Sequence, residues 1–280
     1  MPSSDLAISP RDFDFLSRLV YDRSRICLGP EKQPLVAGRL ARHIRSLGCT
    51  GFADYCGRLA TPAGADEIDV VIDLITTNHT HFFREREHFE LLSRQLLPTL
   101  ATQAKNRGRP LHVWSAAAAS GEEPYSLAIT IAEFARSRSL PGWRVYASDI
   151  SRRMVERCRL GIYEAGKVEL PAADWLPRYF RRGFGPREGY CRVKPEVRRA
   201  VTVEAVNLFQ NAYPVPADLD IVFCRNVMIY FDTPSRADLV NRLFGQLAPG
   251  GYLVIGHTES LLGLRHSFRQ IRPSVFVRPS

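Results

Sequence analysis

The segment from Leu219 to Phe231 (LDIVFCRNVMIYF) constrains the fold more than any other part of the chain. It begins with an apolar run, Ile221–Phe223, which is typical of a buried strand, and it then changes abruptly to the polar Arg225 and Asn226. Open α/β sheets form ligand sites where their buried strands end. Two further segments, HVWSAAAASGEEPYS from His112 and RVYASDIS from Arg144, follow the same plan. We therefore expect one crevice built from three strand ends.

The wider pattern from residue 111 onward predicts an α/β fold. Short apolar runs alternate with helical segments, which indicates a parallel sheet. The expected strands are 111–116, 143–149, about 201–206, 219–225 and 251–256, followed by a final pair near 267–271 and 274–278. A stretch at about 165–200, rich in arginine and glycine, breaks this alternation. We expect it to form a small antiparallel β insertion.

The front of the chain, residues 1–75, predicts a small all-helical domain. Ser9-Pro10 followed by Asp12 is a typical helix start, and Phe13, Leu16 and Val20 recur at helical spacing behind it. No strand-like alternation occurs before residue 75. We expect residues 76–95 to connect this domain to a second one that spans 96–280.

Composition restricts the class of protein. No apolar run approaches the roughly 20 residues of a membrane span, and the first residues (MPSSDLAISP) do not resemble a signal peptide. The six cysteines are scattered without a C-x-x-C pair, which favours reduced thiols and a cytoplasmic location. The net charge of +9 favours an acidic partner. Charge alone leaves nucleic acid, an anionic membrane and an acidic protein surface open.

The strand ends also point to a kind of cofactor. Asp149 ends the second predicted strand, where a carboxylate can accept hydrogen bonds from two ribose hydroxyls. The turn after the first strand has one glycine, Gly121, and therefore matches no phosphate-binding loop. Ala116–Ala119 would let a nucleoside without phosphates approach closely, and S-adenosylmethionine is such a cofactor. The same alanines would equally suit tight packing of a helix on the sheet.

Six motifs, in order along nearly the whole chain, make a resemblance specific. They are TTNHTHFFRE from Thr76, VWSAAAASGEEPYS from Val113, ASDI from Ala147, VNLF from Val206, FCRNVMIYF from Phe223 and GHTES from Gly256. Together they closely resemble the CheR-type chemotaxis receptor methyltransferases, which esterify receptor glutamates with S-adenosylmethionine. The resemblance implies a helical receptor-docking domain. It also implies a class I methyltransferase domain with a Rossmann-like sheet, and the product S-adenosylhomocysteine.

The resemblance also implies roles for individual residues. The implied cofactor-binding residues are Asn78, Thr80 and Arg84 of the 76–95 segment, together with Glu123, Asp149, Asn207, Leu208, Cys224, Arg225 and Asn226. Among these, Glu123 would meet the methionine ammonium, Asp149 the ribose, and Asn207 and Leu208 the adenine. Arg84 and Tyr230 are the implied catalytic residues, with Arg84 steering the substrate carboxylate and Tyr230 lying near the transferred methyl. The family's usual Ser-Thr-Gly is replaced here by Ala119-Ser120-Gly121.

The implied partners are the cytoplasmic helices of chemoreceptors, with no nucleic acid and no membrane insertion. Arg39, Arg42 and Arg45 lie on a basic predicted helix that would dock on glutamate-rich receptor helices, although a solvated helix face would look the same. The insertion resembles those of family members that capture a receptor's C-terminal pentapeptide. Two alternatives remain: methylation of RNA, another protein or a small metabolite, and a non-catalytic S-adenosylmethionine-binding sensor.

The histidines give no metal signature. His79 and His81 are two residues apart and cannot share one helix face. No carboxylate–histidine spacing typical of a metal site surrounds them or His257. We therefore predict no metal site and assign these side chains no chemistry.

Overall fold

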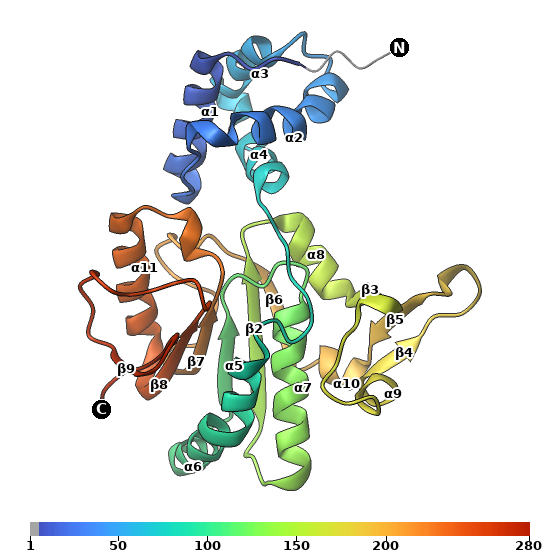
Figure 1. Ribbon diagram of the computed structural model, residues 1–280, viewed down its shortest axis with the longest axis vertical. Coiled ribbons are helices and arrows are strands. Elements are labelled where there is room, and N and C mark those ends of the chain that lie inside the picture. Colours follow the sequence, from blue (N-terminus) through green and yellow to red (C-terminus); the bar gives the residue numbers. More distant parts are fainter. Residues whose placement is uncertain (1–5) are drawn as a thin grey trace. The chain divides into compact units, whose positions relative to one another are not determined.

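The computed structural model describes residues 6–280, so the first five residues of the predicted 1–75 domain lie outside the described part. The described chain forms two compact units (Figure 1). One contains the residues up to Thr77 together with Tyr230–Ser235, and the other contains Asn78–Ile229 with Arg236–Ser280. No helix within residues 6–280 has the length and apolar character needed to cross a membrane.

The first unit is helical, as predicted. It consists of α1 (Pro10–Ser24), α2 (Gln33–Ser46), α3 (Phe52–Leu59) and α4 (Glu67–Ile75). The predicted start of α1 is confirmed, because the Asp12 amide donates to the Ser9 hydroxyl at 3.1 Å. The apolar stripes meet in a core that includes the fully buried Leu16, Leu40 and Tyr55.

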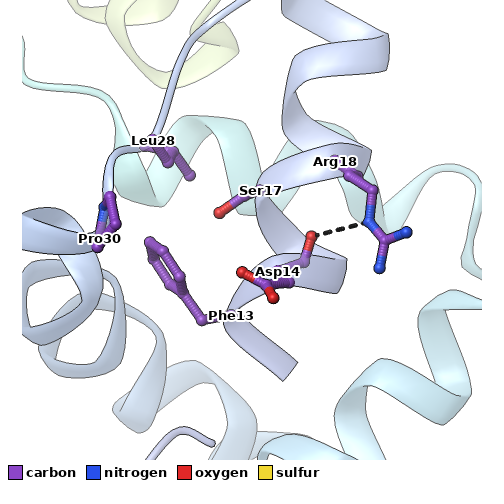
Figure 2. A pocket seen from close by; sticks show the side chains of 6 residues that line it. All are labelled: Phe13, Asp14, Ser17, Arg18, Leu28 and Pro30. Carbon is purple, nitrogen blue, oxygen red and sulfur yellow. Dashed lines mark hydrogen bonds between the residues drawn. The ribbon is translucent and has the colours of Figure 1, made fainter. Parts of the chain in front are cut away.

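This helical unit contains an open pocket of about 420 Å³ (Figure 2). The pocket lies between α1 and the segment that follows it, and none of the predicted site residues lines it. Its lining residues are Phe13, Asp14, Ser17, Arg18, Leu28 and Pro30. The Ser17 hydroxyl is buried and has no hydrogen-bond partner within residues 6–280.

The segment Tyr230–Ser235 joins the helical unit although it follows a strand of the other unit in sequence. The Cys27 amide donates to the Tyr230 carbonyl at 2.9 Å, and Ile26 forms an antiparallel bridge with Phe231. The Tyr21 hydroxyl donates to Asp232 at 2.7 Å. No local sequence pattern marks this return of the chain.

The second unit is built on a seven-stranded sheet in the order β6-β2-β1-β7-β8-β10-β9. The first five strands in this order are parallel, and β10 and β9 complete the sheet in antiparallel fashion. This confirms the predicted α/β fold with a Rossmann-like sheet. The strands are β1 (Leu111–Ser115), β2 (Trp143–Asp149), β6 (Val201–Ala205), β7 (Leu219–Cys224), β8 (Leu247–Ile255), β9 (Arg269–Arg272) and β10 (Val275–Val277).

Burial explains why β7 lies in the middle of the sheet. All six of its residues are buried, as expected for a strand covered on both faces. One of them is the charged Asp220, whose carboxylate accepts from Arg107 at 2.9 Å, Arg109 at 2.7 Å and the His112 amide at 2.8 Å. These bonds offset the cost of removing the charge from water.

Helices cover the sheet, and those that follow β1 lie in the connections between its strands (Figure 1). They are α5 (Arg86–Leu91), α6 (Leu97–Arg107), α7 (Glu122–Ser137), α8 (Arg152–Leu160), α10 (Pro195–Arg198) and α11 (Thr233–Gln246). A π-helical stretch, Leu92–Leu96, joins α5 to α6. The core between helices and sheet includes Leu100, Val113, Leu127 and Phe223, each fully buried.

The predicted antiparallel insertion is confirmed as a three-stranded sheet in the order β3-β5-β4. Its strands are β3 (Ile162–Glu164), β4 (Phe180–Arg182) and β5 (Tyr190–Val193), and α9 (Trp175–Tyr179) precedes β4. The first strand begins before the predicted limit of about 165. In Figure 1 the β4–β5 connection projects from the second unit.

Candidate active site

The turn after β1 lies at the carboxyl end of the sheet and requires small residues. Ala119 and Gly121 have φ angles of +45° and +102°, in the left-handed region. A Cβ on Gly121 would lie 2.6 Å from the Cys158 Sγ and 2.8 Å from the Tyr163 hydroxyl oxygen. Only glycine combines this conformation with such close packing. The turn therefore packs closely against α8 and β3 at the carboxyl end of the sheet.

Asp149 lies at the end of β2, beside this turn. Its carboxylate accepts from the Ala119 amide at 2.8 Å and from the Ser151 amide at 2.9 Å, and the residue is 8% exposed. Backbone donors thus fix the direction of the carboxylate. The Val206 amide donates to the Asp149 carbonyl at 3.0 Å, which places the segment with Asn207 next to it.

Asn207 and Leu208 follow β6 on a tight turn. The Asn207 side-chain oxygen accepts from the Phe209 backbone amide at 2.9 Å, and the Asn207 backbone amide donates to the Gln210 side-chain oxygen at 3.2 Å. Leu208 is buried. Asp149, Asn207 and Leu208 thus come from neighbouring strand ends, as sheet order requires.

Arg225 is the centre of an ion-pair network at the end of β7. Its guanidinium donates to Glu123 at 2.8 Å, to Glu85 at 2.9 Å and to the Arg84 carbonyl at 2.6 Å, and its side chain is 1% exposed. The Asn226 side chain donates to Glu85 at 3.1 Å. The network brings together four residues predicted for the site, together with Glu85, which sequence analysis did not single out.

The two carboxylates respond differently to their shared partner. Burial opposes ionisation of Glu85, but the hydrogen bonds and charge of Arg225 outweigh it and lower the pKa to about 2. Burial raises the pKa of Glu123, against the attraction of Arg225 and a hydrogen bond from Ser115. Glu123 therefore already has protein partners, which any cofactor ammonium would have to share.

The segment before α5 is anchored by two adjacent phenylalanines. Phe82 packs edge-on against Tyr163 and Phe180, and Phe83 packs against Phe89. Phe83 and Glu85 both have left-handed φ angles, +54° and +56°. Such conformations are costly for residues with side chains and persist where the surroundings enforce them.

Arg84 lies between these two strained residues. Its guanidinium donates to the His79 carbonyl at 2.8 Å. No carboxylate pairs with it among residues 6–280. Asn78 and Thr80, from the same segment, are half-buried.

Two predicted residues occupy positions that restrict their roles. Cys224 is completely buried, and burial raises the pKa of its thiol well above the usual value. A ligand in the crevice could reach Cys224 only through its backbone. Tyr230 belongs to the helical unit, whereas Arg84, Arg225 and Asn226 belong to the sheet unit.

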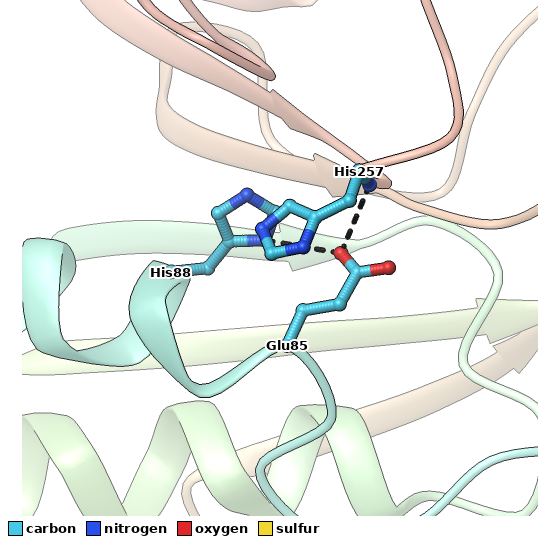
Figure 3. Close-up of side chains that lie close together, drawn as sticks. All are labelled: Glu85, His88 and His257. Atoms are coloured by element: carbon cyan, nitrogen blue, oxygen red, sulfur yellow. Dashed lines mark hydrogen bonds and ion pairs between the residues drawn. The ribbon is translucent and has the colours of Figure 1, made fainter.

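Glu85, His88 and His257 form a cluster that sequence spacing could not reveal (Figure 3). Their candidate ligand atoms lie within 4.8 Å of one another. However, the Glu85 carboxylate is already bonded to Arg225, to Asn226 and to the His257 amide. A divalent cation there would be repelled by the buried guanidinium. The cluster is better explained as part of the ion-pair network than as a metal site.

The comparisons with known proteins agree with this geometry. Residues 11–76 match the CheR methyltransferase all-alpha domain, and residues 78–277 match the CheR methyltransferase SAM binding domain. A chemotaxis protein methyltransferase of Salmonella typhimurium is 41% identical over 94% of this chain and 88% of its own length. Chemotaxis protein methyltransferase 2 of Pseudomonas aeruginosa is 38% identical over 95% of this chain and 92% of its own length. The chain belongs to the CheR methyltransferase family.

Proposed function

We propose that this protein transfers the methyl group of S-adenosylmethionine to glutamate side chains of chemoreceptors and releases S-adenosylhomocysteine. The observation that carries the proposal is Arg84. Within residues 6–280 it has a backbone carbonyl as its partner and no carboxylate, whereas Arg225 nearby forms ion pairs with Glu85 and Glu123. A guanidinium so placed is suited to bind an incoming carboxylate.

The crevice fits S-adenosylmethionine on its own chemistry. Asp149 offers an acceptor for ribose hydroxyls at the end of β2, and the Ala119 amide fixes the direction of its carboxylate. We assign the methionine end of the cofactor to the pair of Glu123 and Arg225. Bound there, the cofactor would supply an electrophilic methyl group on a sulfonium.

Esterification of a glutamate requires little acid–base catalysis by the protein. A glutamate with an ordinary pKa near 4.3 is ionised at neutral pH, so no general base is needed. Arg84 would hold the carboxylate in line with the methyl and help to replace its water. We assign Tyr230 a contact near the reacting methyl.

We further propose that α2 of the helical unit docks on glutamate-rich receptor helices. Arg42 and Arg45 are exposed on this helix. Arg39 is different, because its guanidinium donates to the carbonyls of Ile75 and Thr76 and to the Thr77 hydroxyl. The docking role therefore falls mainly on Arg42 and Arg45, and Arg39 ties α2 to the end of α4.

The insertion is the proposed site for a receptor's C-terminal pentapeptide. Its outer strand β4 offers backbone groups for strand addition, and Phe184 and Tyr190 beside it are 88% and 42% exposed. Arginines of β4 would attract an acidic peptide. We expect an acidic–aromatic pentapeptide to bind at millimolar concentration or below, and expect deletion of Gly183–Gly189 to reduce methylation of tailed receptors only. A peptide that shows no binding at that concentration would mean that the enzyme acts without a tether.

A methyl-transfer assay tests the central proposal. The protein is incubated with methyl-labelled S-adenosylmethionine and chemoreceptors from its own organism. Transferred label should be released as methanol by mild base, because carboxyl methyl esters hydrolyse and N-methyl groups do not. Base-stable label, or label on RNA, would favour another methyltransferase activity. Cofactor binding without transfer would indicate a sensor.

A further inference from the structure

Glu259 is a buried carboxylate that bonds to the loop after β7, and none of the proposed cofactor or substrate contacts involves it. It is 8% exposed and accepts four backbone hydrogen bonds. The donors are the amides of Asn226 at 2.8 Å, Val227 at 2.9 Å, Met228 at 2.7 Å and Gly256 at 2.6 Å. Three of these belong to the loop that follows β7. A carboxylate saturated by backbone donors is a rigid support for that loop.

The loop needs such support because Asn226 has a left-handed backbone, with φ +56°. From this conformation its side chain donates to Glu85 at 3.1 Å. The loop position is therefore transmitted to the segment that carries Arg84. Without an acceptor for its amides, the loop would lose the hydrogen bonds that stabilise this strained backbone conformation.

Gly256 is matched to this arrangement. A Cβ at Gly256 would lie 2.6 Å from the Asn226 Nδ2, 2.9 Å from the Glu259 Oε2 and 3.0 Å from the Asn226 amide nitrogen. These are the atoms through which Glu259 holds Asn226. A methyl group there would separate the two residues while leaving both in the sequence.

We propose that Glu259, with Gly256, is a positioning residue for cofactor binding. It fixes Asn226 and the loop after β7, so that the crevice is shaped before the cofactor enters. This inference rests on the proposed use of the crevice for S-adenosylmethionine. Both residues belong to the GHTES motif, so we assign this motif the role of positioning the loop after β7.

The test uses three full-length variants. Glu259→Gln keeps the size but places an amide group against backbone donors, and Gly256→Ala displaces the carboxylate without removing it. Glu156→Gln on α8, an exposed glutamate paired with Arg159, is the matched control. S-adenosylhomocysteine affinity is measured by calorimetry at a temperature where circular dichroism shows each variant folded.

We expect both loop variants to bind S-adenosylhomocysteine about tenfold more weakly or worse, since a binding group misplaced by about 1 Å loses most of its contribution. The control should match the parent. The KM for S-adenosylmethionine should rise while the KM for receptor stays within twofold, a split that a loss of folded protein would not produce. If Glu259→Gln does not fold, Gly256→Ala decides.

Parent-like affinity in a folded Gly256→Ala or Glu259→Gln variant would overturn the inference. Failure of the parent itself to bind S-adenosylhomocysteine would instead overturn the proposed function. The two failures are therefore distinguishable in one set of titrations.

Discussion

The arginine that follows β7 and the arginines on α2 have the same chemical group but lie in different surroundings. Arg225 is 1% exposed and bonded to two carboxylates and a carbonyl, whereas Arg42 and Arg45 are exposed on the helix surface. Buried charges depend on their partners, but exposed charges act through a field that salt screens. The net charge of +9 therefore includes arginines that stabilise the fold as well as arginines that we propose to bind a partner.

Arg39 sharpens the comparison because it lies on the same helix as Arg42. Its bonds to the carbonyls at the end of α4 resemble those of Arg225 to the Arg84 carbonyl more than those of a docking residue. In both cases an arginine donates to backbone carbonyls of another segment of its own unit. Position on a basic helix is therefore a poor guide to an arginine's role.

The largest expected effect is on stability, from Arg225→Met. It leaves Glu85 and Glu123 without their buried cation, which costs about 3–5 kcal/mol of unfolding free energy. Denaturant unfolding measures it. Arg86→Met, which removes an exposed pair with Glu90 at 3.3 Å, should cost less than about 1 kcal/mol. Equal losses would show that burial does not separate the two classes of arginine.

Arg84→Ala should lower kcat for receptor methylation roughly 100-fold and leave the fold intact, because the substrate carboxylate would lose its orientation. Arg84→Lys should recover part of the rate, since it keeps the charge but not the two-pronged hydrogen bonding. Initial rates with labelled cofactor measure both. A parent-like rate in Arg84→Ala would remove this residue from the chemistry.

A third expected effect is a pH dependence at His88. Burial, and then the charges of Arg225 and His257, lower the pKa of His88 to about 3, with Glu85 opposing them. Between about pH 6.5 and 3 the unfolded chain binds more protons than the folded one, so stability falls on acidification.

The measurement compares the parent with His88→Phe from pH 7 to pH 5. Stability of the parent should lose about 1.4 kcal/mol per pH unit below pH 6.5 through this group, and the variant should lack that loss. His79→Phe, at an exposed position, is the matched control. Parallel curves for the parent and His88→Phe would show that the buried imidazole does not control acid stability.

The sequence was sufficient to predict the parts of the fold that depend on local pattern. The predicted strands of the large sheet agree with the observed ones to within a few residues, and the signal is clearest in β7, because its burial on both faces leaves a continuous apolar run. The start of α1 was visible as a cap. The motif positions at Asp149 and Arg225 also followed from strand ends in a parallel sheet.

What the sequence did not reveal depends on contacts between distant residues. Glu85 and Glu259 lie inside recognised motifs, yet only the fold shows that they bind Arg225 and the loop after β7. The return of Tyr230–Ser235 to the helical unit has no local signature. The bonding of Arg39 to the end of α4 was hidden for the same reason.

A smaller effect is expected at Asp149. Asp149→Ala should weaken S-adenosylhomocysteine binding about tenfold or more, since hydrogen bonds to a charged acceptor contribute roughly 1.5–3 kcal/mol. Calorimetry is made where the variant is folded, because the Ala119 and Ser151 amides also lose their acceptor. Asp238→Ala, in an exposed pair with Arg242, is the control. Unchanged affinity would place the cofactor elsewhere.

The smallest expected effect belongs to the exposed arginines. Arg42→Ala combined with Arg45→Ala should raise the KM for receptor about three- to tenfold at low salt, because exposed pairs contribute little each. The increase in the KM for receptor should become smaller as ionic strength rises, because the Debye length shortens. Arg11→Ala with Arg58→Ala removes the same charge from exposed positions on α1 and α3. If that control raises KM equally, the receptor responds to the net charge of the unit, and α2 is not its docking surface.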